Sequence, residues 1–454
     1  MPKLVAPLKL QEAYEGTVET LAFGGEGIVR HDKFVIFIPY TVPGDRIRFR
    51  VTQVKQSFAR GRVESILEPS SFRVTPPCPI YLNCGGCQHQ ELEYSRSIEE
   101  KSRILKSLLE HGLKLDNAPV ESPLPCPAPY GYRHKMQVAV GESTDGKLHV
   151  GLYQPFTHRI VDMPTCPIQH PLDNELLNVF RETFISLGWE PYDESSNTGL
   201  IRHFLTRVNQ KEEAYTVLVA TRADLPGWES LKDALVKRVP KLQGIAVNVN
   251  PLRTNVVLGR ETRILWGKPY LEETIDGILF RFGPTSFFQV NPYLLSPITK
   301  KILEWLNPSD RDEVLDLYCG VGTFTLPMSK KVGQIVGIEE NSDSIGWAKE
   351  NKKLNSCQNV KFIAGKVEES LRKFKPGQFS HLFLDPPRKG LHPDALQAII
   401  KLNASKILYL SCNPSTLVRD ANALIENGWK LTRALAADFF PQTSQIEALA
   451  LLEK

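Results

Sequence analysis

After residue 292 the sequence alternates between helical segments and short apolar runs, and this alternation leaves few possible folds. Short apolar runs that lack regular polar positions are typical of strands buried on both faces of a parallel sheet. Strands that alternate with helices predict an α/β fold with a doubly wound sheet. We expect the strands at Val314–Leu317, Ile335–Ile338, Val360–Ile363, His381–Leu384 and Ile407–Leu410.

Two polar segments directly follow predicted strands of this sheet. They are Asp385-Pro386-Pro387-Arg388-Lys389-Gly390 and Ser411-Cys412-Asn413-Pro414. Open α/β sheets place their ligands at the carboxyl ends of the strands, so Cys412 is a candidate nucleophile there. An isolated cysteine would more often be a small apolar core residue. The polar and proline neighbours of Cys412 favour a turn at the strand end instead.

An Asp-Pro-Pro turn beside a cysteine suits methyl transfer to a pyrimidine carbon. The C5 carbon of uracil is a poor nucleophile, and addition of a thiolate at C6 converts the ring into an enolate that can attack a methyl sulfonium. A base must then remove the C5 proton so that the cysteine can leave. Glu447, an acid in the otherwise apolar run 446–449, is the candidate base. A surface residue on an edge strand is the alternative interpretation of Glu447.

A glycine turn after the first predicted strand indicates a nucleotide-type cofactor. Gly320 and Gly322 follow Asp316, and Glu339 ends the next strand nineteen residues beyond Gly320. An acid at about this spacing accepts hydrogen bonds from ribose hydroxyls. Thr325 replaces the third glycine of the dinucleotide fingerprint, which argues against NAD. The remaining pattern resembles class I S-adenosylmethionine-dependent methyltransferases.

Four of the eight cysteines have a spacing that suits a metal site. Cys78, Cys84 and Cys87 are clustered, and Cys166 follows much later. Four thiolates suit tetrahedral zinc or a four-iron, four-sulfur cluster, and three clustered cysteines plus a distant one are more typical of the cluster. The cysteines at 126, 319 and 357 show no ligand spacing and are expected to be structural.

The first part of the chain differs in pattern from the rest. Residues 14–68 alternate short β-type runs with turns, which predicts a small barrel of the oligonucleotide-binding (OB) kind. Arg46, Arg48 and Arg50 alternate at strand period and should share one face, either for nucleic acid or merely for solvent. A helix is expected from about 95 to 115. The loop 119–129 contains five prolines and should not be regular, whereas residues 130–280 show an α+β pattern.

The bulk properties are those of an ordinary globular protein. With 454 residues, 42% hydrophobic content and a net charge of +4, the chain should form about three domains. No apolar stretch approaches ~18 residues and no secretory signal is evident, so we expect a cytoplasmic protein with no membrane contact.

Taken together, these motifs resemble the RNA uracil-5-methyltransferase family, in particular its iron–sulfur members that modify 23S ribosomal RNA. The resemblance also includes Ser286–Pro292 and covers nearly the whole chain. It implies an RNA-binding TRAM barrel at 1–68 and a central domain at 69–285 that carries a [4Fe-4S] cluster. It further implies a Rossmann-like catalytic domain at 286–454, with the helix at 95–115 packed on it.

The resemblance also implies roles for single residues. S-adenosylmethionine contacts would fall on Gln289, Tyr318, Glu339 and Asp385. The nucleophile would be Cys412 and the base Glu447, and the cluster ligands Cys78, Cys84, Cys87 and Cys166. Thr323 departs from the asparagine of some members, which leaves its contact with the methionine end open. The expected partner is 23S ribosomal RNA and the expected state a monomer. A transfer-RNA enzyme and a non-enzymatic iron–sulfur RNA-binding protein are the alternatives.

Overall fold

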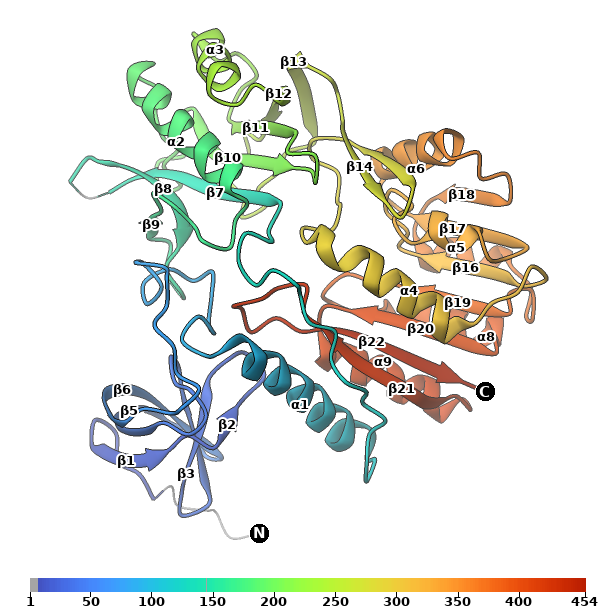
Figure 1. Ribbon diagram of the computed structural model, residues 1–454, viewed down its shortest axis with the longest axis horizontal. Helices are drawn as coiled ribbons and strands as arrows, with labels where there is room; N and C mark the ends of the chain where they lie inside the picture. The colour runs from blue at the N-terminus through green and yellow to red at the C-terminus, as the bar shows by residue number, and fades with distance from the viewer. Residues whose placement is uncertain (1–6, 144) are drawn as a thin grey trace.

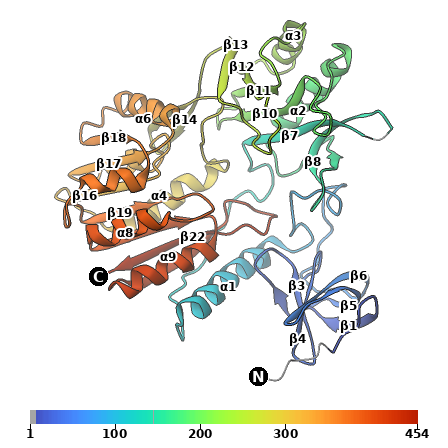
Figure 2. The same ribbon diagram turned by 180° about the vertical axis from the view of Figure 1, so that it is seen from behind.

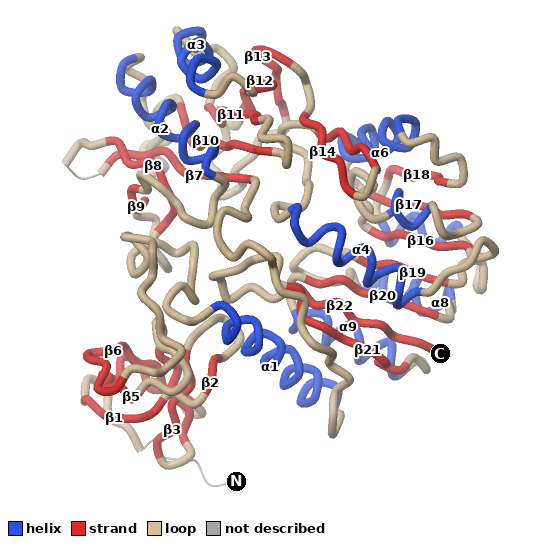
Figure 3. The backbone as a smooth tube through the Cα atoms, in the orientation of Figure 1, coloured by secondary structure: helices blue, strands red, loops and turns tan. Residues whose placement is uncertain are grey.

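The computed structural model describes residues 7–143 and 145–454, which form three parts (Figure 1). A small β-barrel comes first, a mixed sheet with two helices follows, and a larger sheet flanked by helices completes the chain. Between these parts the chain runs mainly as loops (Figure 3). Among the residues that the structure describes, no strand pairing joins the sheets, so loops and one long helix connect the three parts. Within the described ranges, no helix is long and apolar enough to cross a membrane.

The N-terminal part is a six-stranded sheet in the order β1-β5-β6-β4-β3-β2. Alternate residues of β5, namely Ile47, Phe49 and Val51, are fully buried and form its core together with Val29 and Ile36. This burial confirms the expected OB-like barrel. The strands are β1 (Ala13–Thr17), β2 (Thr20–Leu21), β3 (Gly27–His31), β4 (Phe34–Ile38), β5 (Arg46–Val54) and β6 (Phe58–Glu68).

Arg46, Arg48 and Arg50 lie on the outer face of β5, as their spacing predicts. The segment that carries them has no acid of its own, but the neighbouring strands β1 and β6 bring carboxylates beside each arginine. Part of the positive charge of this face is therefore balanced within the barrel. The ion pairs are Arg46–Glu15 at 3.1 Å, Arg46–Glu68 at 2.6 Å, Arg48–Glu64 at 3.6 Å and Arg50–Glu64 at 2.5 Å.

The central part is a seven-stranded sheet in the order β13-β12-β11-β10-β7-β8-β9, with α2 and α3 packed against it. A separate hairpin, β14–β15, leads into the C-terminal part. β13 and β14 carry polar and charged residues at many positions, so no apolar run predicted them. The elements are β7 (Lys135–Glu142), β8 (Leu148–Tyr153), β9 (Ile160–Asp162), α2 (Pro171–Ser186), β10 (Ile201–Val208), β11 (Ala214–Ala220), α3 (Trp228–Arg238), β12 (Leu242–Val249), β13 (Glu261–Gly267), β14 (Leu271–Ile275) and β15 (Ile278–Phe282).

The C-terminal sheet has the order β18-β17-β16-β19-β20-β22-β21, and its first five strands are parallel. Successive residues of β20 alternate between two cores, Leu408 and Leu410 facing one and Ile407 and Tyr409 the other. The doubly wound α/β sheet is thus confirmed, and two antiparallel strands, β22 and β21, extend it. The strands are β16 (Glu313–Leu317), β17 (Gln334–Glu339), β18 (Val360–Ala364), β19 (His381–Leu384), β20 (Lys406–Ser411), β21 (Lys430–Ala437) and β22 (Glu447–Glu453).

Helices cover both faces of this sheet (Figure 2). The two faces are covered by different parts of the chain. On one face, α1 adds residues of the early chain to the core that holds α8 and α9. The helices are α4 (Leu295–Leu306), α5 (Thr325–Ser329), α6 (Ser342–Leu354), α7 (Val367–Ser370), α8 (Pro393–Leu402) and α9 (Pro414–Glu426), with 3-10 turns η1 (Pro292–Leu294) and η2 (Leu371–Lys373).

The long helix α1 (Tyr94–Leu113) packs on α9 and β21, far from the sheet that follows it in sequence (Figure 2). Its residue Gly112 permits this close approach, because a Cβ there would lie 2.2 Å from a methyl of Val418. The Gly112 carbonyl also accepts a hydrogen bond from Asn422 Nδ2 at 2.8 Å. The chain thus leaves the barrel, contacts the C-terminal sheet and only then forms the central sheet.

The proline-rich loop 119–129 is more regular than expected. Val120 and Leu124 form parallel bridges to Ala434 and Ala437 on the edge of β21. The prolines occupy positions that donate no hydrogen bond, while the N–H groups of Glu121 and Leu124 pair with β21 carbonyls at 2.7 and 2.8 Å. Proline is tolerated on such an edge, where one side of the strand needs no donors.

Candidate active site

Two strand-end segments, 385–390 after β19 and 411–414 after β20, lie side by side at the carboxyl edge of the sheet. Asn413 Nδ2 donates a hydrogen bond to the Arg388 carbonyl at 3.1 Å and so fastens one segment to the other. Gly390 has a φ of +73°, and a Cβ there would lie within 2.7 Å of the Arg419 and Asp420 side chains of α9. The glycine thus allows both the turn and the close packing against α9.

Cys412 is half-buried just before the first turn of α9. Asn413 caps that helix by accepting a hydrogen bond from the Ser415 N–H at 3.2 Å, and Pro414 starts it. A helix N-terminus favours an anionic thiolate. Burial opposes the charge, however, and with the Glu447 and Asp385 carboxyl groups it raises the pKa of Cys412 to about 11, while Arg388 lowers it.

Glu447 is the first residue of β22, which lies between β20 and β21. The antiparallel register pairs Ser411 with Ala448, so the next pair in that register would be Cys412 with Glu447. Only 5% of Glu447 is exposed, which rules out the alternative of a surface position on an edge strand. Burial raises the pKa of Glu447 far above its ordinary value; Asp385 adds to this shift and Arg388 opposes it.

The thiol and two carboxyl groups therefore form one electrostatically coupled set. Asp385 contributes from the end of β19, and its pKa is raised to about 7 by burial and by the Glu339 carboxylate. Groups that interact this strongly titrate together rather than one by one. A carboxyl group held partly protonated near neutral pH is typical of a site that moves protons.

The glycine turn after β16 forms the neighbouring rim of the site. Gly320 N donates a hydrogen bond to Glu339 Oε2 at 3.2 Å, so the loop and the predicted ribose-binding acid are in contact. Tyr318 has a φ of +68°, an uncommon conformation for a bulky residue that often marks a functional turn. Thr325, which replaces the missing third glycine, is buried and donates its hydroxyl to Asp316.

The structure brings five predicted residues to one edge of the sheet. Tyr318, Glu339, Asp385, Cys412 and Glu447 all lie at strand ends β16, β17, β19, β20 and β22. Gln289 instead lines a small cavity together with His134, Lys135, Arg207 and Glu273. No hydrogen bond of the described residues links Gln289 to the strand-end set.

The structure adds Arg388 and Asn413 to the site. Arg388 is the cation that lowers the pKa of both Cys412 and Glu447. Asn413 caps α9 and joins the two strand-end segments. Both belong to the motifs that the sequence singles out, but their roles depend on contacts between segments about 25 residues apart.

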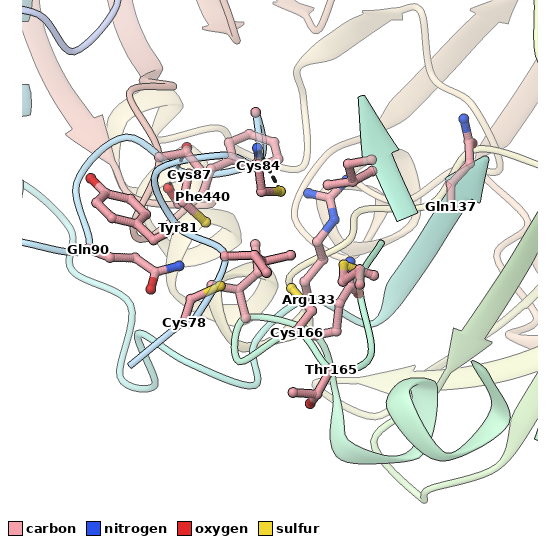
Figure 4. A pocket seen from close by; sticks show the side chains of 18 of the residues that line it. Cys78, Tyr81, Cys84, Cys87, Gln90, Arg133, Gln137, Thr165, Cys166 and Phe440 are labelled. Carbon is pink, nitrogen blue, oxygen red and sulfur yellow. Dashed lines mark hydrogen bonds between the residues drawn. The ribbon is translucent and has the colours of Figure 1, made fainter. Parts of the chain in front are cut away.

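The four predicted metal ligands line one cavity of about 210 Å³ between the cysteine loop and the central sheet (Figure 4). Burial raises the pKa of the Cys87 thiol to about 12, and Cys166, Cys84 and Cys78 each add to the shift. Among the described residues, no group of three or more His, Cys, Asp or Glu side chains has the spacing to hold a metal ion. The cysteines thus converge on a shared space without closing on a single point.

The pKa of Cys412 provides a test of this coupled set. Replacing Asp385 by Asn removes a negative charge that disfavours the thiolate, so the pKa of Cys412 should fall. Each unit of decrease should raise the thiolate fraction about tenfold at a fixed pH below both pKa values, and the rate of alkylation by iodoacetamide about threefold, because a less basic thiolate is also less nucleophilic. The measurement is the alkylation rate against pH, with the peptide identified by mass spectrometry. Asp394→Asn, on the exposed start of α8, is the control, and equal profiles for Asp385→Asn and the unmodified protein would contradict the coupling.

Comparison with known proteins agrees with this geometry. Residues 204–454 match the model of the tRNA (uracil-5-)-methyltransferase family, and residues 11–63 match the TRAM domain. An uncharacterized RNA methyltransferase of Halalkalibacterium halodurans is 35% identical over 100% of this chain and 99% of its own. One from Listeria monocytogenes is 36% identical over 98% of each chain. The tRNA (uracil-54, C5)-methyltransferase of Pyrococcus abyssi, solved with S-adenosyl-L-homocysteine, is 26% identical with a TM-score of 0.77, over 96% of this chain and 99% of its own.

The doubly wound sheet with its glycine turn and spaced acid is that of an S-adenosylmethionine-dependent methyltransferase. The family model covers more than half of the chain, and relatives above 30% identity cover all of it. The chain belongs to the RNA uracil-5-methyltransferase family. It is an S-adenosylmethionine-dependent RNA methyltransferase with an N-terminal TRAM domain, which confirms the expected class of enzyme.

Proposed function

We propose that this enzyme methylates C5 of a specific uridine in 23S ribosomal RNA through a covalent adduct between Cys412 and C6. The observation that carries the proposal is the register of β20 and β22, which sets the buried Glu447 across from the half-buried Cys412. A nucleophile and a base on neighbouring strands can act on adjacent carbons of one ring.

Each residue has one task in this scheme. The Cys412 thiolate bonds to C6, and the electron pair of the C5–C6 bond moves toward the C4 carbonyl. Bound S-adenosylmethionine supplies an electrophilic methyl group. The enolate electron pair returns to C5, which takes this methyl group as S-adenosylhomocysteine is released. The Glu447 carboxylate then removes the C5 proton. The electrons of the C5–H bond restore the double bond as the Cys412 sulfur leaves. Tyr318, Glu339, Asp385 and, by family resemblance, Gln289 are the proposed contacts for the cofactor.

A transfer RNA is the second candidate substrate, and one observation favours it. The Pyrococcus abyssi enzyme, whose name specifies tRNA, aligns over 96% of this chain. An enzyme that aligns with nearly the whole of this chain can therefore act on tRNA. The presence of the additional N-terminal parts thus does not by itself indicate which RNA is the substrate. The resemblance to the iron–sulfur members supports ribosomal RNA, and the four cysteines on one cavity agree with it.

Methyl-labelled S-adenosylmethionine should distinguish the two substrates. We expect the purified enzyme to label unmodified 23S ribosomal RNA at uridine C5 and to leave unmodified tRNA and 16S ribosomal RNA unlabelled. The product is identified by nuclease digestion and mass spectrometry of 5-methyluridine. Label in tRNA with none in 23S ribosomal RNA would refute the ribosomal proposal and support the tRNA alternative.

We also propose that Cys78, Cys84, Cys87 and Cys166 hold a [4Fe-4S] cluster. Zinc needs its thiolates within ~2.3 Å of one point, whereas a four-iron cluster places a different iron at each thiolate and so separates them. The support for the cluster is that all four cysteines line one cavity, three of them from one loop and Cys166 from a distant segment. Such a cluster would cross-link the cysteine loop to the segment that precedes α2.

Metal analysis should test this assignment. Protein purified without oxygen should be brown and contain about four irons per chain. Cys84→Ser should lower the iron content, destabilise the central part and weaken RNA binding, because the loop 78–87 loses its anchor. The cofactor pocket is built from other strands, so S-adenosylmethionine affinity should remain. Cys357→Ser is the control, and one zinc per chain with no iron in the anaerobic protein would contradict the cluster.

We propose that the three parts divide the tasks of RNA binding, cluster binding and catalysis. The barrel at 1–68 would bind RNA through the arginine face of β5, where acids already pair each arginine and leave less net charge for phosphates. The central domain would cover 69–285 and the catalytic domain 286–454, with α1 contributed to the latter. We further propose that the enzyme acts in the cytoplasm as a monomer.

A further inference from the structure

The segment between β21 and β22, residues 438–446, has no regular secondary structure but is held at each of four successive carbonyls. We call it the junction segment. Its donors come from four separate regions of the chain: the loop before η1, α1, the approach to β7 and residues 88–89, directly after the cysteine loop 78–87. The hydrogen bonds are Asn291 Nδ2 to Phe439 O at 3.1 Å, Lys101 Nζ to Phe440 O at 2.9 Å, Tyr132 OH to Pro441 O at 3.0 Å, and the N–H groups of Gln88 and His89 to Gln442 O at 3.0 and 2.9 Å.

Lys101 makes the most unusual of these contacts. Its side chain is 1% exposed, and its ammonium donates to Asp438 Oδ1 at 2.7 Å as well as to the Phe440 carbonyl. Asp438 is fully buried. Apolar residues of similar volume often serve stability equally well in such a place. The ion pair also fixes the position of the junction segment, because its directional hydrogen bonds determine where that backbone lies.

The junction segment leads directly into Glu447. Three of its residues, Phe440, Thr443 and Gln445, line the cavity of the four cysteines. Ser444 N also donates to the Gln88 side chain at 3.1 Å, just beyond the cysteine loop. The same nine residues therefore contact α1, the cysteine cavity and the proposed base.

We propose that Lys101 is a positioning residue, which holds the junction segment so that the Glu447 carboxylate reaches the C5 proton. This inference rests on the proposed function, because it assumes that Glu447 is the base. Lys101 does not contact the substrate in this scheme. Its effect is confined to the last step, since Cys412 and the cofactor rim belong to other strands. The cysteine cavity contacts the same segment, so the cysteine loop would support Glu447 as well.

The test replaces the buried pair by neutral groups of similar size. Lys101→Met alone leaves Asp438 as an unpaired buried charge and could prevent folding, so the main variant is Lys101→Met with Asp438→Asn. We expect unchanged S-adenosylmethionine binding and a kcat lowered about 100-fold, the effect of a displacement near 1 Å. The KM for RNA should fall in parallel and kcat/KM should stay unchanged, because the slowed step follows formation of the adduct. The methylated covalent adduct should accumulate, as seen with labelled cofactor on a denaturing gel.

Two further variants separate positioning from general damage. Lys106→Met removes an exposed lysine of the same helix and should change neither kcat nor the adduct. Tyr132→Phe removes only the hydrogen bond to the Pro441 carbonyl and keeps the ring packed. It should also increase the amount of methylated adduct, but less than the double variant does. This milder variant decides the question if the double variant does not fold.

The outcome is read against Glu447→Gln. Suppose that Glu447→Gln traps the methylated adduct, whereas the folded double variant and Tyr132→Phe both show the same low amount of adduct as the unmodified protein. The positioning inference is then overturned, and the proposed function stands. If Glu447→Gln traps no adduct and keeps normal turnover, the proposed base itself is wrong. An adduct in the Lys101 variants that matches the trapped species supports the inference.

Discussion

Cys412→Ala should abolish methyl transfer and every covalent RNA adduct. Without the sulfur there is no addition at C6, and the uracil ring stays too weakly nucleophilic to accept the methyl group. Removal of a catalytic nucleophile in other enzymes lowers kcat by about 10⁶-fold, so activity should fall below detection. The measurement is label transfer from S-adenosylmethionine to RNA, with the RNA resolved from protein on a denaturing gel.

The loss should be chemical rather than structural. Cys412 is only half-buried, and the cap of α9 is made by Asn413, so the variant should fold and bind S-adenosylmethionine normally. Cys357→Ala removes a buried cysteine at the other edge of the sheet and should keep full activity. Methylation by Cys412→Ala above one thousandth of the normal rate would mean that another group adds to the ring.

The parallel strands were predictable because their sequences are apolar on both faces. Such runs have few other stable locations, and β19 matches the predicted His381–Leu384 at both ends. The strand-end motifs were predictable for the same reason, since a polar turn after a buried strand must lie at the carboxyl edge. Local sequence was therefore sufficient to bring Asp385 and Cys412 to one edge.

What the sequence does not contain is the order of the last two strands. The position of Glu447 beside Cys412 depends on β22 entering between β20 and β21, a pairing between segments about 40 residues apart. An acid in an apolar run indicates a buried or functional carboxyl group but not its neighbour. The acids that pair with the barrel arginines were missed for the same reason, because they come from β1 and β6.

For the prolines of 119–129 and for Gln289, only the tertiary structure shows what surrounds them. Prolines exclude a central strand, but they permit an edge, and only the tertiary structure shows the free edge of β21 that receives them. Gln289 was assigned by family resemblance, and it lines a small cavity together with Phe282 and Phe288, whose rings stack at 4.4 Å between centres. Contact between Gln289 and a bound cofactor remains a prediction.

Glu447→Gln should accumulate the covalent adduct that Cys412→Ala cannot form. The thiolate of Cys412 still adds to C6 and the methyl group still transfers, because neither step needs the carboxylate. Removal of the C5 proton is then slowed by about 10²–10⁴-fold, the usual contribution of a general base. A protein–RNA complex that carries the methyl group and survives denaturation should accumulate. Labelled cofactor and a denaturing gel measure it, and Glu453→Gln at the far end of β22 is the control.

The pH dependence of stability provides a check that the carboxyl group itself was removed. Burial raises the pKa of Glu447 in the folded protein, so the folded state binds a proton more tightly than the unfolded state. By linkage, the contribution of Glu447 to the free energy of unfolding is greatest below the unfolded pKa of about 4.3 and decreases as the pH rises toward the folded value. Glu447→Gln cannot titrate and should lose less stability over that range in urea unfolding.

If the Glu447→Gln variant turns over RNA at the normal rate with no adduct, another group is the base, and the C-terminal strand has a structural role only.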